Sequence, residues 1–319
     1  MAGKSFGQSV AGITGVRDTT YNLNNEYQKL LKTYPDAKMT QPPAAGLVME
    51  KKNIAYCKTA ERDLTLDVFY PVKKTKTKPA GPGGRTAIII IHGGGWRNGN
   101  KSMFHPMAQQ LAALGYTCFT PEYRLSTEAL YPAAVHDIKS AIKWVKANAK
   151  EYDIDTNRIV AAGHSAGGEL AAMMGATNNI SSFEGRPCNL NYSAVVSAVI
   201  DLDGLLAFIH PESGEGDDSK RTSAATNWFG FSKTENPGLW KQGSPLTHAG
   251  KHTPPTLFIN SNVDRMHAGR EDYIKVLNEY NIYTETRSFD APHSFCLFEP
   301  WFTPTIKYMD DFLKKVFKD

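Results

Sequence analysis

The fold of this chain is decided around one stretch, Gly163-His164-Ser165-Ala166-Gly167. An apolar run at 158–162 precedes it, and a run with the composition of a helix follows at 168–174. The stretch therefore predicts a strand, a sharp turn that carries Ser165, and a helix. A serine hydroxyl is a poor nucleophile by itself. The turn indicates catalysis only if a histidine base and backbone N–H donors come from elsewhere in the chain.

N–H donors of that kind are predicted after the most apolar segment of the sequence. Residues 87–91 are an alanine and four isoleucines, the composition of a central strand covered on both faces. They lead into His92-Gly93-Gly94-Gly95-Trp96. Three glycines after a buried strand let the backbone turn its N–H groups outward, as an oxyanion hole requires. A phosphate-binding loop is less well supported, because the stretch has neither a G-K-[ST] ending nor a dinucleotide fingerprint.

The base and the acid are predicted in the turns after two later strands. Asp264 follows the strand predicted at 256–260, and His293 follows the strand predicted at 283–289. Chain order Ser165, Asp264, His293 is that of the α/β-hydrolase arrangement, in which histidine takes the serine proton and a carboxylate orients the histidine. We therefore predict these three residues as the catalytic triad.

Two other aspartates remain alternatives for the acid. Asp203 follows the strand predicted at 194–202 and could reach the histidine from there. Asp272 is a third candidate, although its place inside the helix predicted at 269–280 argues against it.

Strands and helices alternate over most of the chain, which predicts an α/β fold with a mostly parallel central sheet, helices on both faces and an insertion after the sixth strand. Further strands are predicted at 53–56, 64–70, 116–120 and 155–160, and further helices at 21–34, 103–114 and 133–149. Residues 1–45 are predicted to form an N-terminal arm packed on the body, and residues 46–319 a single domain. Within it, residues 205–255 are rich in turn formers and are expected to cover or wall the pocket.

Composition narrows the possible partners and compartments. The net charge is +4 over 319 residues, and the densest basic run, 73–78, leads into a Pro/Gly-rich loop, so nucleic-acid binding is not expected. The four cysteines form no C-x-x-C pair, which leaves zero or one disulfide and no predicted metal site. No apolar run reaches the length of a membrane span. We expect a secreted or periplasmic protein whose leader is not part of this sequence, with a cytoplasmic protein as the alternative.

With these motifs in order, the chain resembles α/β-hydrolase esterases of the hormone-sensitive-lipase-like group from about Leu64 to its C-terminus. The resemblance implies Ser165 as nucleophile, His293 as base, and an oxyanion hole from the N–H groups of Gly94, Gly95 and Ala166. A narrower likeness, carried by 202–240 and 298–302, is to bacterial esterases that remove acetyl or feruloyl groups from plant cell-wall polysaccharides. Asp203-Gly204 departs from the broad group, where many members have a serine-containing turn.

The resemblance implies two-step acyl transfer without a metal or cofactor, on a small-molecule or polysaccharide ester, with no nucleic-acid or membrane partner. Trp96, Trp228 and Trp301 are predicted to stack on a sugar ring or an aromatic acyl group. An arylformamidase or amidase is the nearest alternative. A ligand-binding module without catalysis is less well supported, because the chain keeps both Ser165 and His293.

Overall fold

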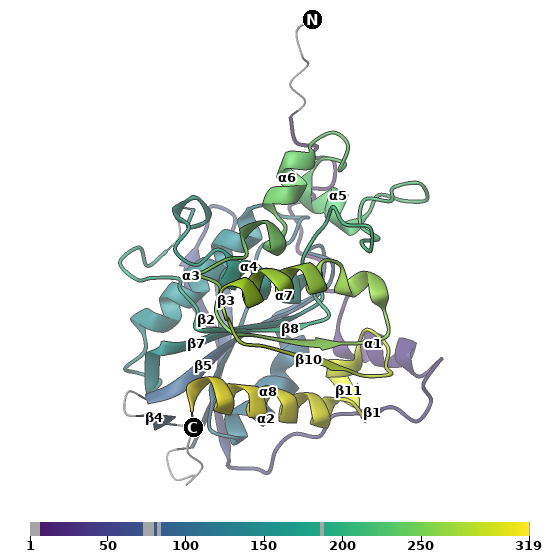
Figure 1. Cartoon of the computed structure of the whole chain (residues 1–319). Coiled ribbons are helices and arrows are strands. Elements are labelled where there is room, and N and C mark those ends of the chain that lie inside the picture. Colours follow the sequence, from purple (N-terminus) through teal and green to yellow (C-terminus); the bar gives the residue numbers. More distant parts are fainter. Residues whose placement is uncertain (1–6, 73–79, 82–83, 186–187, 319) are drawn as a thin grey trace, which may run out of the picture.

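The computed structural model describes residues 7–72, 80–81, 84–185 and 188–318. The lysine-rich loop predicted at 73–78 lies outside the described residues. Among those described, nine strands form one twisted sheet at the centre of the molecule (Figure 1). The strands are β2 (Val48–Lys58), β3 (Asp63–Pro71), β4 (Ala80–Gly81), β5 (Gly84–Ile91), β6 (Thr117–Pro121), β7 (Ile154–His164), β8 (Ala198–Leu202), β9 (Thr256–Asn260) and β10 (Thr284–Ser288).

The strand order is β10-β9-β8-β7-β5-β6-β3-β2, with β4 paired to the side of β5. All neighbours from β10 through to β6 are parallel. The pairs β2–β3, β3–β6 and β4–β5 are antiparallel. The predicted mostly parallel sheet is therefore confirmed. Strand β7, which carries the serine turn at its carboxyl end, lies in the middle of the sheet between β5 and β8.

Helices cover both faces of this sheet. The α-helices of the described residues are α1 (Leu23–Leu30), α2 (His105–Ala113), α3 (Ala133–Ala147), α4 (Ala166–Ala176), α5 (Ala224–Phe229), α6 (Pro237–Gln242), α7 (Arg270–Glu279) and α8 (Phe302–Phe317). Figure 1 shows α2 and α8 on one side of the sheet and α3, α4 and α7 on the other. The side chains of β5 alternate accordingly, since Ile89 and Ile91 pack with α3 and α4 while Ile88 and Ile90 pack with α2 and α8. This double covering explains the unbroken apolar run at 87–91.

The N-terminal segment, residues 7–45, runs along the body. Gln8 donates a side-chain hydrogen bond to the carbonyl of Phe229 at 3.0 Å, and the N–H of Gly99 donates to the carbonyl of Asp18 at 2.9 Å. Farther on, the short strand β1 (Lys38–Met39) pairs antiparallel with β11 (Phe298–Glu299). These contacts fasten the segment to three parts of the chain that are distant in sequence.

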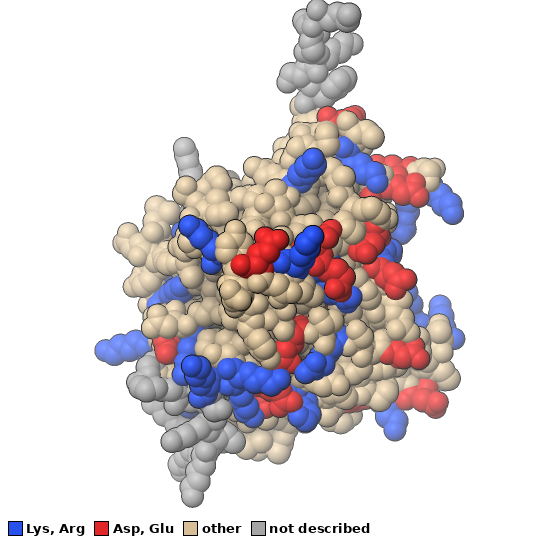
Figure 2. Space-filling model, viewed as in Figure 1, with Lys and Arg blue, Asp and Glu red and all other residues tan. Residues whose placement is uncertain are grey.

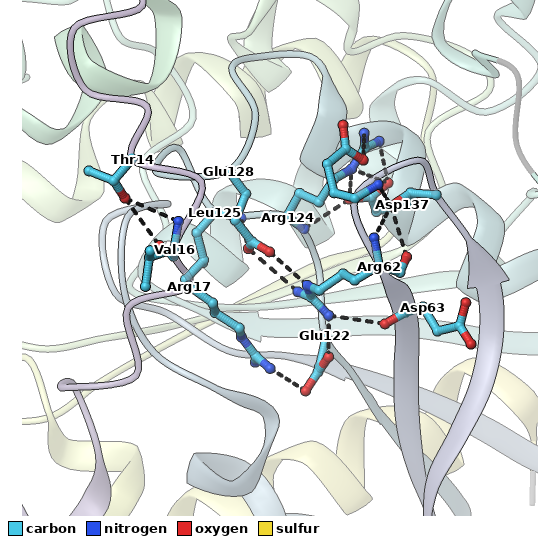
Figure 3. Close-up of polar contacts among 12 residues, drawn as sticks. Thr14, Val16, Arg17, Arg62, Asp63, Glu122, Arg124, Leu125, Glu128 and Asp137 are labelled. Carbon is cyan, nitrogen blue, oxygen red and sulfur yellow. Dashed lines mark hydrogen bonds and ion pairs between the residues drawn. The ribbon is translucent and has the colours of Figure 1, made fainter.

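A half-buried network of ion pairs adds a fourth attachment (Figure 3). Arg17 contacts Glu122, whose second carboxylate oxygen lies 2.6 Å from the guanidinium of Arg62. Arg62 also contacts Glu128 at 2.6 Å. Burial would raise the pKa of Glu122, but the guanidinium groups of Arg17 and Arg62 hold it below its ordinary value. The network thus stays charged and joins the N-terminal segment to the end of β6.

A disulfide joins Cys57 in β2 to Cys188, 131 residues later, in line with the upper limit expected from the sequence. Cys118 and Cys296 are buried free thiols. No helix of the described residues has the length and apolar character needed to cross a membrane. On the face seen in Figure 2, acidic and basic side chains lie among one another.

Candidate active site

The predicted strand, turn and helix around Ser165 are confirmed. Ser165 lies between β7 and α4 with a positive φ of 58°, a conformation that residues with a side chain seldom adopt. Its N–H donates to the carbonyl of Leu202 at 2.9 Å, and its carbonyl accepts from the N–H of Glu169 at 3.0 Å. A Cβ on Gly163 would approach the carbonyl oxygen of Gly167 to 2.0 Å, so the turn closes only with glycine there. The backbone is thereby forced to present the half-buried serine to the adjoining pocket.

The glycine loop after β5 lies at the same pocket. Gly94 has a φ of 118°, and a Cβ there would meet the carbonyl oxygen of Asn98 at 1.9 Å, so a side chain cannot be accommodated. The carbonyl of Gly94 accepts from the N–H groups of Arg97 and Asn98, both at 3.1 Å, which closes the loop into a tight turn. Among the described residues, no hydrogen-bond acceptor contacts the N–H of Gly94 or Gly95. Gly94, Gly95 and Ala166 line the pocket together with Ser165.

His293 lines this pocket too, and its partner is Asp203. The Nδ1 atom of His293 lies 2.9 Å from Oδ2 of Asp203, whose side chain is fully buried. Burial would raise the pKa of Asp203, but contacts with His267 and His293 and the N–H of Ser261, which donates at 2.8 Å, lower it well below its ordinary value. An ionised carboxylate only accepts hydrogen bonds. The Nδ1 of His293 therefore carries the hydrogen, and its Nε2 is free to accept a proton.

The prediction that Asp264 contacts His293 is wrong. After β9 the chain turns at Ser261, whose N–H binds Asp203, and Asp264 then begins a short 3₁₀ helix in which it is exposed. The third candidate, Asp272, is also exposed and lies 3.3 Å from His210. The signal for Asp203 was its place directly after a strand. Only the strand order shows that this strand, β8, is the neighbour of β7, which carries Ser165.

Sequence reasoning gave no catalytic role to two other histidines that contact this pair. His164 holds its Nε2 2.7 Å from the carbonyl oxygen of His293. Burial lowers the pKa of His164 to about 3, so the ring is neutral and its Nε2–H donates to that carbonyl. His267 places its Nε2 3.5 Å from Oδ1 of Asp203. His164 thus fixes the backbone of His293, while His267 adds a polar neighbour to Asp203.

Of the three tryptophans predicted to bind substrate, only Trp96 lines the pocket. The predictions for Trp228 and Trp301 are wrong. Trp228 is fully buried and stacks on Trp96 with 4.8 Å between ring centroids, so it belongs to the core beneath the pocket. Trp301 packs edge-on against Tyr34 and lines a separate cavity of about 650 Å³ that does not include Ser165.

The pocket has a volume of about 910 Å³, and two distant segments wall it. One is the N-terminal segment, which contributes Tyr21, Glu26 and Lys29. The other lies within 205–255 and contributes mostly polar and charged side chains, among them Asp217, Lys220, Arg221 and Asn227. Sequence reasoning missed the N-terminal contribution, because no local pattern shows which face of the body a helix such as α1 will meet.

The sequence of this chain is similar to one protein family and to several curated proteins. The BD-FAE family matches residues 66–269, more than half of the chain. Esterase LipC of Mycobacterium tuberculosis H37Rv is 26% identical over 70% of this chain and 54% of its own length. Carboxylesterase NlhH of the same species is 32% identical over 40% of this chain and 38% of its own length. The chain thus spans about half the length of the curated relatives it matches, or less.

Solved structures show the same fold. A truncated carbohydrate esterase from gut microbiota superposes with a TM-score of 0.72 at 24% identity, covering 86% of this chain and 100% of that one. A propionate-bound thermophilic esterase, Est2 from Thermogutta terrifontis, superposes with a TM-score of 0.66 at 24% identity, covering 89% and 97%. These solved structures confirm the predicted α/β-hydrolase fold. The family match and the curated relatives confirm the resemblance to esterases of the hormone-sensitive-lipase-like group.

Proposed function

The chain belongs to the BD-FAE family, and from this premise we propose that it is a serine carboxylester hydrolase with Ser165 as nucleophile, His293 as base and Asp203 as acid. The observation that carries the proposal is the His293–Asp203 contact at the pocket that Ser165 and the Gly94–Gly95 loop also line. The names of the curated relatives, esterases and carboxylesterases, support the same reaction class.

In the proposed reaction, the hydroxyl oxygen of Ser165 attacks the ester carbonyl while Nε2 of His293 takes the hydroxyl proton. The carbonyl oxygen becomes negatively charged and accepts hydrogen bonds from the N–H groups of Gly94, Gly95 and Ala166. One such donor lowers the barrier by about 2.7–4 kcal/mol. Asp203 stabilises the imidazolium of His293 that forms at this point. The tetrahedral intermediate then collapses, and the leaving alcohol departs with the proton from His293.

The second half of the reaction releases the acid. A water molecule gives one proton to Nε2 of His293 and attacks the acyl-serine ester. The same N–H groups stabilise the second oxyanion. The carboxylic acid leaves when His293 returns the proton to the oxygen of Ser165, which restores the starting state.

We propose short acyl or feruloyl groups on a carbohydrate as the ester removed. The polar side chains of the pocket wall, such as Asn227 and Asp217, suit the hydroxyl groups of a sugar, and Trp96 offers an aromatic edge. A carbohydrate esterase with the same fold is consistent with this substrate class. The Cys57–Cys188 disulfide supports a secreted or periplasmic location, where polysaccharide esters occur and disulfides persist.

For the domain organisation, we propose an N-terminal arm at 1–45 and a hydrolase domain at 46–319, in which 205–255 is an insertion that walls the pocket. The arm proposal is supported by the contacts of Gln8, Asp18 and β1 with the body. The insertion proposal is supported by the wall residues that 205–255 contributes to the pocket.

The test is hydrolysis of p-nitrophenyl acetate by the wild type beside Ser165→Ala. We expect the wild type to turn over and release p-nitrophenol in a burst, with an acetyl group on Ser165 detectable by mass spectrometry. The variant should lose at least about 10³-fold in kcat, because the nucleophile is gone. Equal, slow rates from two folded proteins would refute ester hydrolysis. Faster turnover of an aryl formamide than of any ester would show that the reaction is amide hydrolysis rather than ester hydrolysis.

A further inference from the structure

One buried carboxyl group near the pocket has no part in the reaction described above. Glu169 lies one helical turn after Ser165 in α4, and its N–H donates to the carbonyl of Ser165. Its side chain is fully buried, yet one carboxyl oxygen, Oε2, accepts a hydrogen bond from the indole nitrogen of Trp96 at 2.9 Å. Trp96 is the residue that directly follows Gly94 and Gly95. This side-chain contact joins the helix of the serine to the glycine loop.

The surroundings of Glu169 favour the neutral form of its carboxyl group. Burial raises the pKa of Glu169 well above its ordinary value, and the nearby carboxyl of Asp201 raises it further, while the hydrogen bond from Trp96 opposes the shift. A carboxylic acid still offers an oxygen that accepts from an indole N–H. Its other oxygen, Oε1, has no hydrogen-bond partner among the described residues. Within the described part of the chain, the contact with Trp96 is therefore the one hydrogen bond that the carboxyl group of Glu169 makes.

Trp96 needs such a restraint. Its φ of 55° lies in the left-handed region, where a residue with a side chain is strained. Four contacts hold it there, namely the stacking of its ring on Trp228, a tilted ring contact with Phe208, the hydrogen bond from the N–H of Ser126 to its carbonyl at 2.7 Å, and the hydrogen bond to Glu169. Of these four, only the contact with Glu169 reaches α4, the element that also carries Ala166.

We propose that Glu169 is a positioning residue that sets the spacing between the two halves of the oxyanion hole. One half, the N–H groups of Gly94 and Gly95, belongs to the loop that ends at Trp96, and the other half, the N–H of Ala166, belongs to α4. Glu169 links the two through the indole of Trp96. The proposal rests on the proposed esterase function, because the oxyanion forms only in that reaction.

Three variants separate positioning from packing. Glu169→Gln keeps an oxygen acceptor, so its kcat for p-nitrophenyl acetate should stay within about threefold of the wild type. Glu169→Leu keeps the volume but loses the acceptor, and Trp96→Phe keeps a ring but loses the donor. Removing one oxyanion donor costs about 10²–10³ in kcat, so displacing the loop should cost about tenfold or more. KM should change by less than about twofold, because the contact acts on the transition state.

The double variant Trp96→Phe/Glu169→Leu sharpens the test. If the two residues act through one hydrogen bond, the double variant should be no slower than the slower single variant. Losses that multiply would overturn the proposal, because each residue would then act separately. Glu169→Gln that is as slow as Glu169→Leu would overturn it as well.

A readout independent of turnover is the indole ¹H–¹⁵N resonance of Trp96, identified by its loss in Trp96→Phe. We expect this resonance to move in Glu169→Leu and to remain near its place in Glu169→Gln. A moved resonance with unchanged kcat would overturn the positioning role. Wild-type protein without turnover of any ester would refute the proposed function instead, and the resonance would still report whether the contact exists.

Discussion

The floor of the pocket and its wall are built in opposite ways. The floor consists of the Ser165 turn, the Gly94–Gly95 loop and Asp203, all of which lie at the carboxyl ends of the central strands β5, β7 and β8 and are fixed by short backbone hydrogen bonds. The wall consists of side chains from the N-terminal segment and from 205–255, many of them exposed. The difference indicates that the chemistry depends on backbone geometry, whereas substrate selection depends on exposed side chains.

Among the changes that leave the nucleophile in place, the largest effect is expected from Asp203→Asn, compared with Asp264→Asn. The buried carboxylate of Asp203 holds Nδ1–H of His293, and an amide at such a place in a serine triad stabilises the wrong tautomer, which lowers kcat by about 10⁴-fold. Asp264 is exposed, so its variant should keep kcat within about twofold. Steady-state kinetics on p-nitrophenyl acetate will separate the two. A large loss in Asp264→Asn with little in Asp203→Asn would restore the original prediction.

The next effect is expected from Gly94→Ala in the floor. A methyl group there would overlap the carbonyl oxygen of Asn98, and the φ of 118° is unfavourable for alanine, so the loop must move. We expect a loss of about 10²-fold in kcat with the melting temperature lowered by a few degrees. Gly238→Ala serves as the matched control, because the nearest atom to its Cβ would be 3.6 Å away. Similar kcat values for the two variants would contradict an active role of the loop.

The buried histidines of the floor should make the fold sensitive to acid. The pKa of His164 is lowered by burial to about 3, whereas an unfolded histidine titrates near about 6.5. As the pH falls through this window, the unfolded chain binds a proton that the folded chain does not, so stability falls by up to about 1.4 kcal/mol per pH unit. His164→Gln should lose less stability than the wild type between pH 7 and 5 in urea unfolding. Equal losses of stability in the wild type and in His164→Gln would show that His164 is protonated in the folded state.

The smallest effect is expected in the wall. Lys220 and Arg221 are exposed, and an exposed charge contributes about 1 kcal/mol at most to binding a charged or polar group. The double variant Lys220→Gln/Arg221→Gln should leave kcat for p-nitrophenyl acetate unchanged and alter KM for an acylated oligosaccharide by about two- to fivefold. Lys251→Gln, also exposed but not part of the pocket, is the control. A tenfold fall of kcat in the double variant would erase the distinction between floor and wall.

The serine turn and the glycine loop of the floor could be predicted from sequence because their requirements are local. Ser165 needs glycines within two residues on each side, and the glycine loop must follow a buried strand, so each motif lies within one short stretch. The acid of the triad could not be identified from a local pattern. Asp203 and Asp264 both follow strands in the sequence, and the choice between them depends on the turn at Ser261 and on the order of strands in the sheet. Neither feature leaves a local pattern.

The wall and the tryptophans could not be predicted for a related reason. A tryptophan in a sequence indicates a large apolar side chain but not whether it faces a pocket or the core, and Trp228 faces the core. The place of Tyr21 and Lys29 at the pocket is decided by tertiary docking of the N-terminal segment. The sequence around Glu169 indicates only a helical residue, because its burial and its contact with Trp96 depend on the tertiary structure.

The attachment of the N-terminal segment through Arg17 and Glu122 has a thermodynamic consequence. A substrate that touches both Lys29 and the body binds only when the segment is docked, so docking and substrate binding favour each other by the same coupling free energy. The attachment is partly ionic and only one-fifth of the Arg17 side chain is exposed, so salt acts on it less than on a surface pair. Bound substrate should therefore hold the segment in its docked position. Saturating substrate should protect the backbone amides of residues 14–30 from hydrogen exchange.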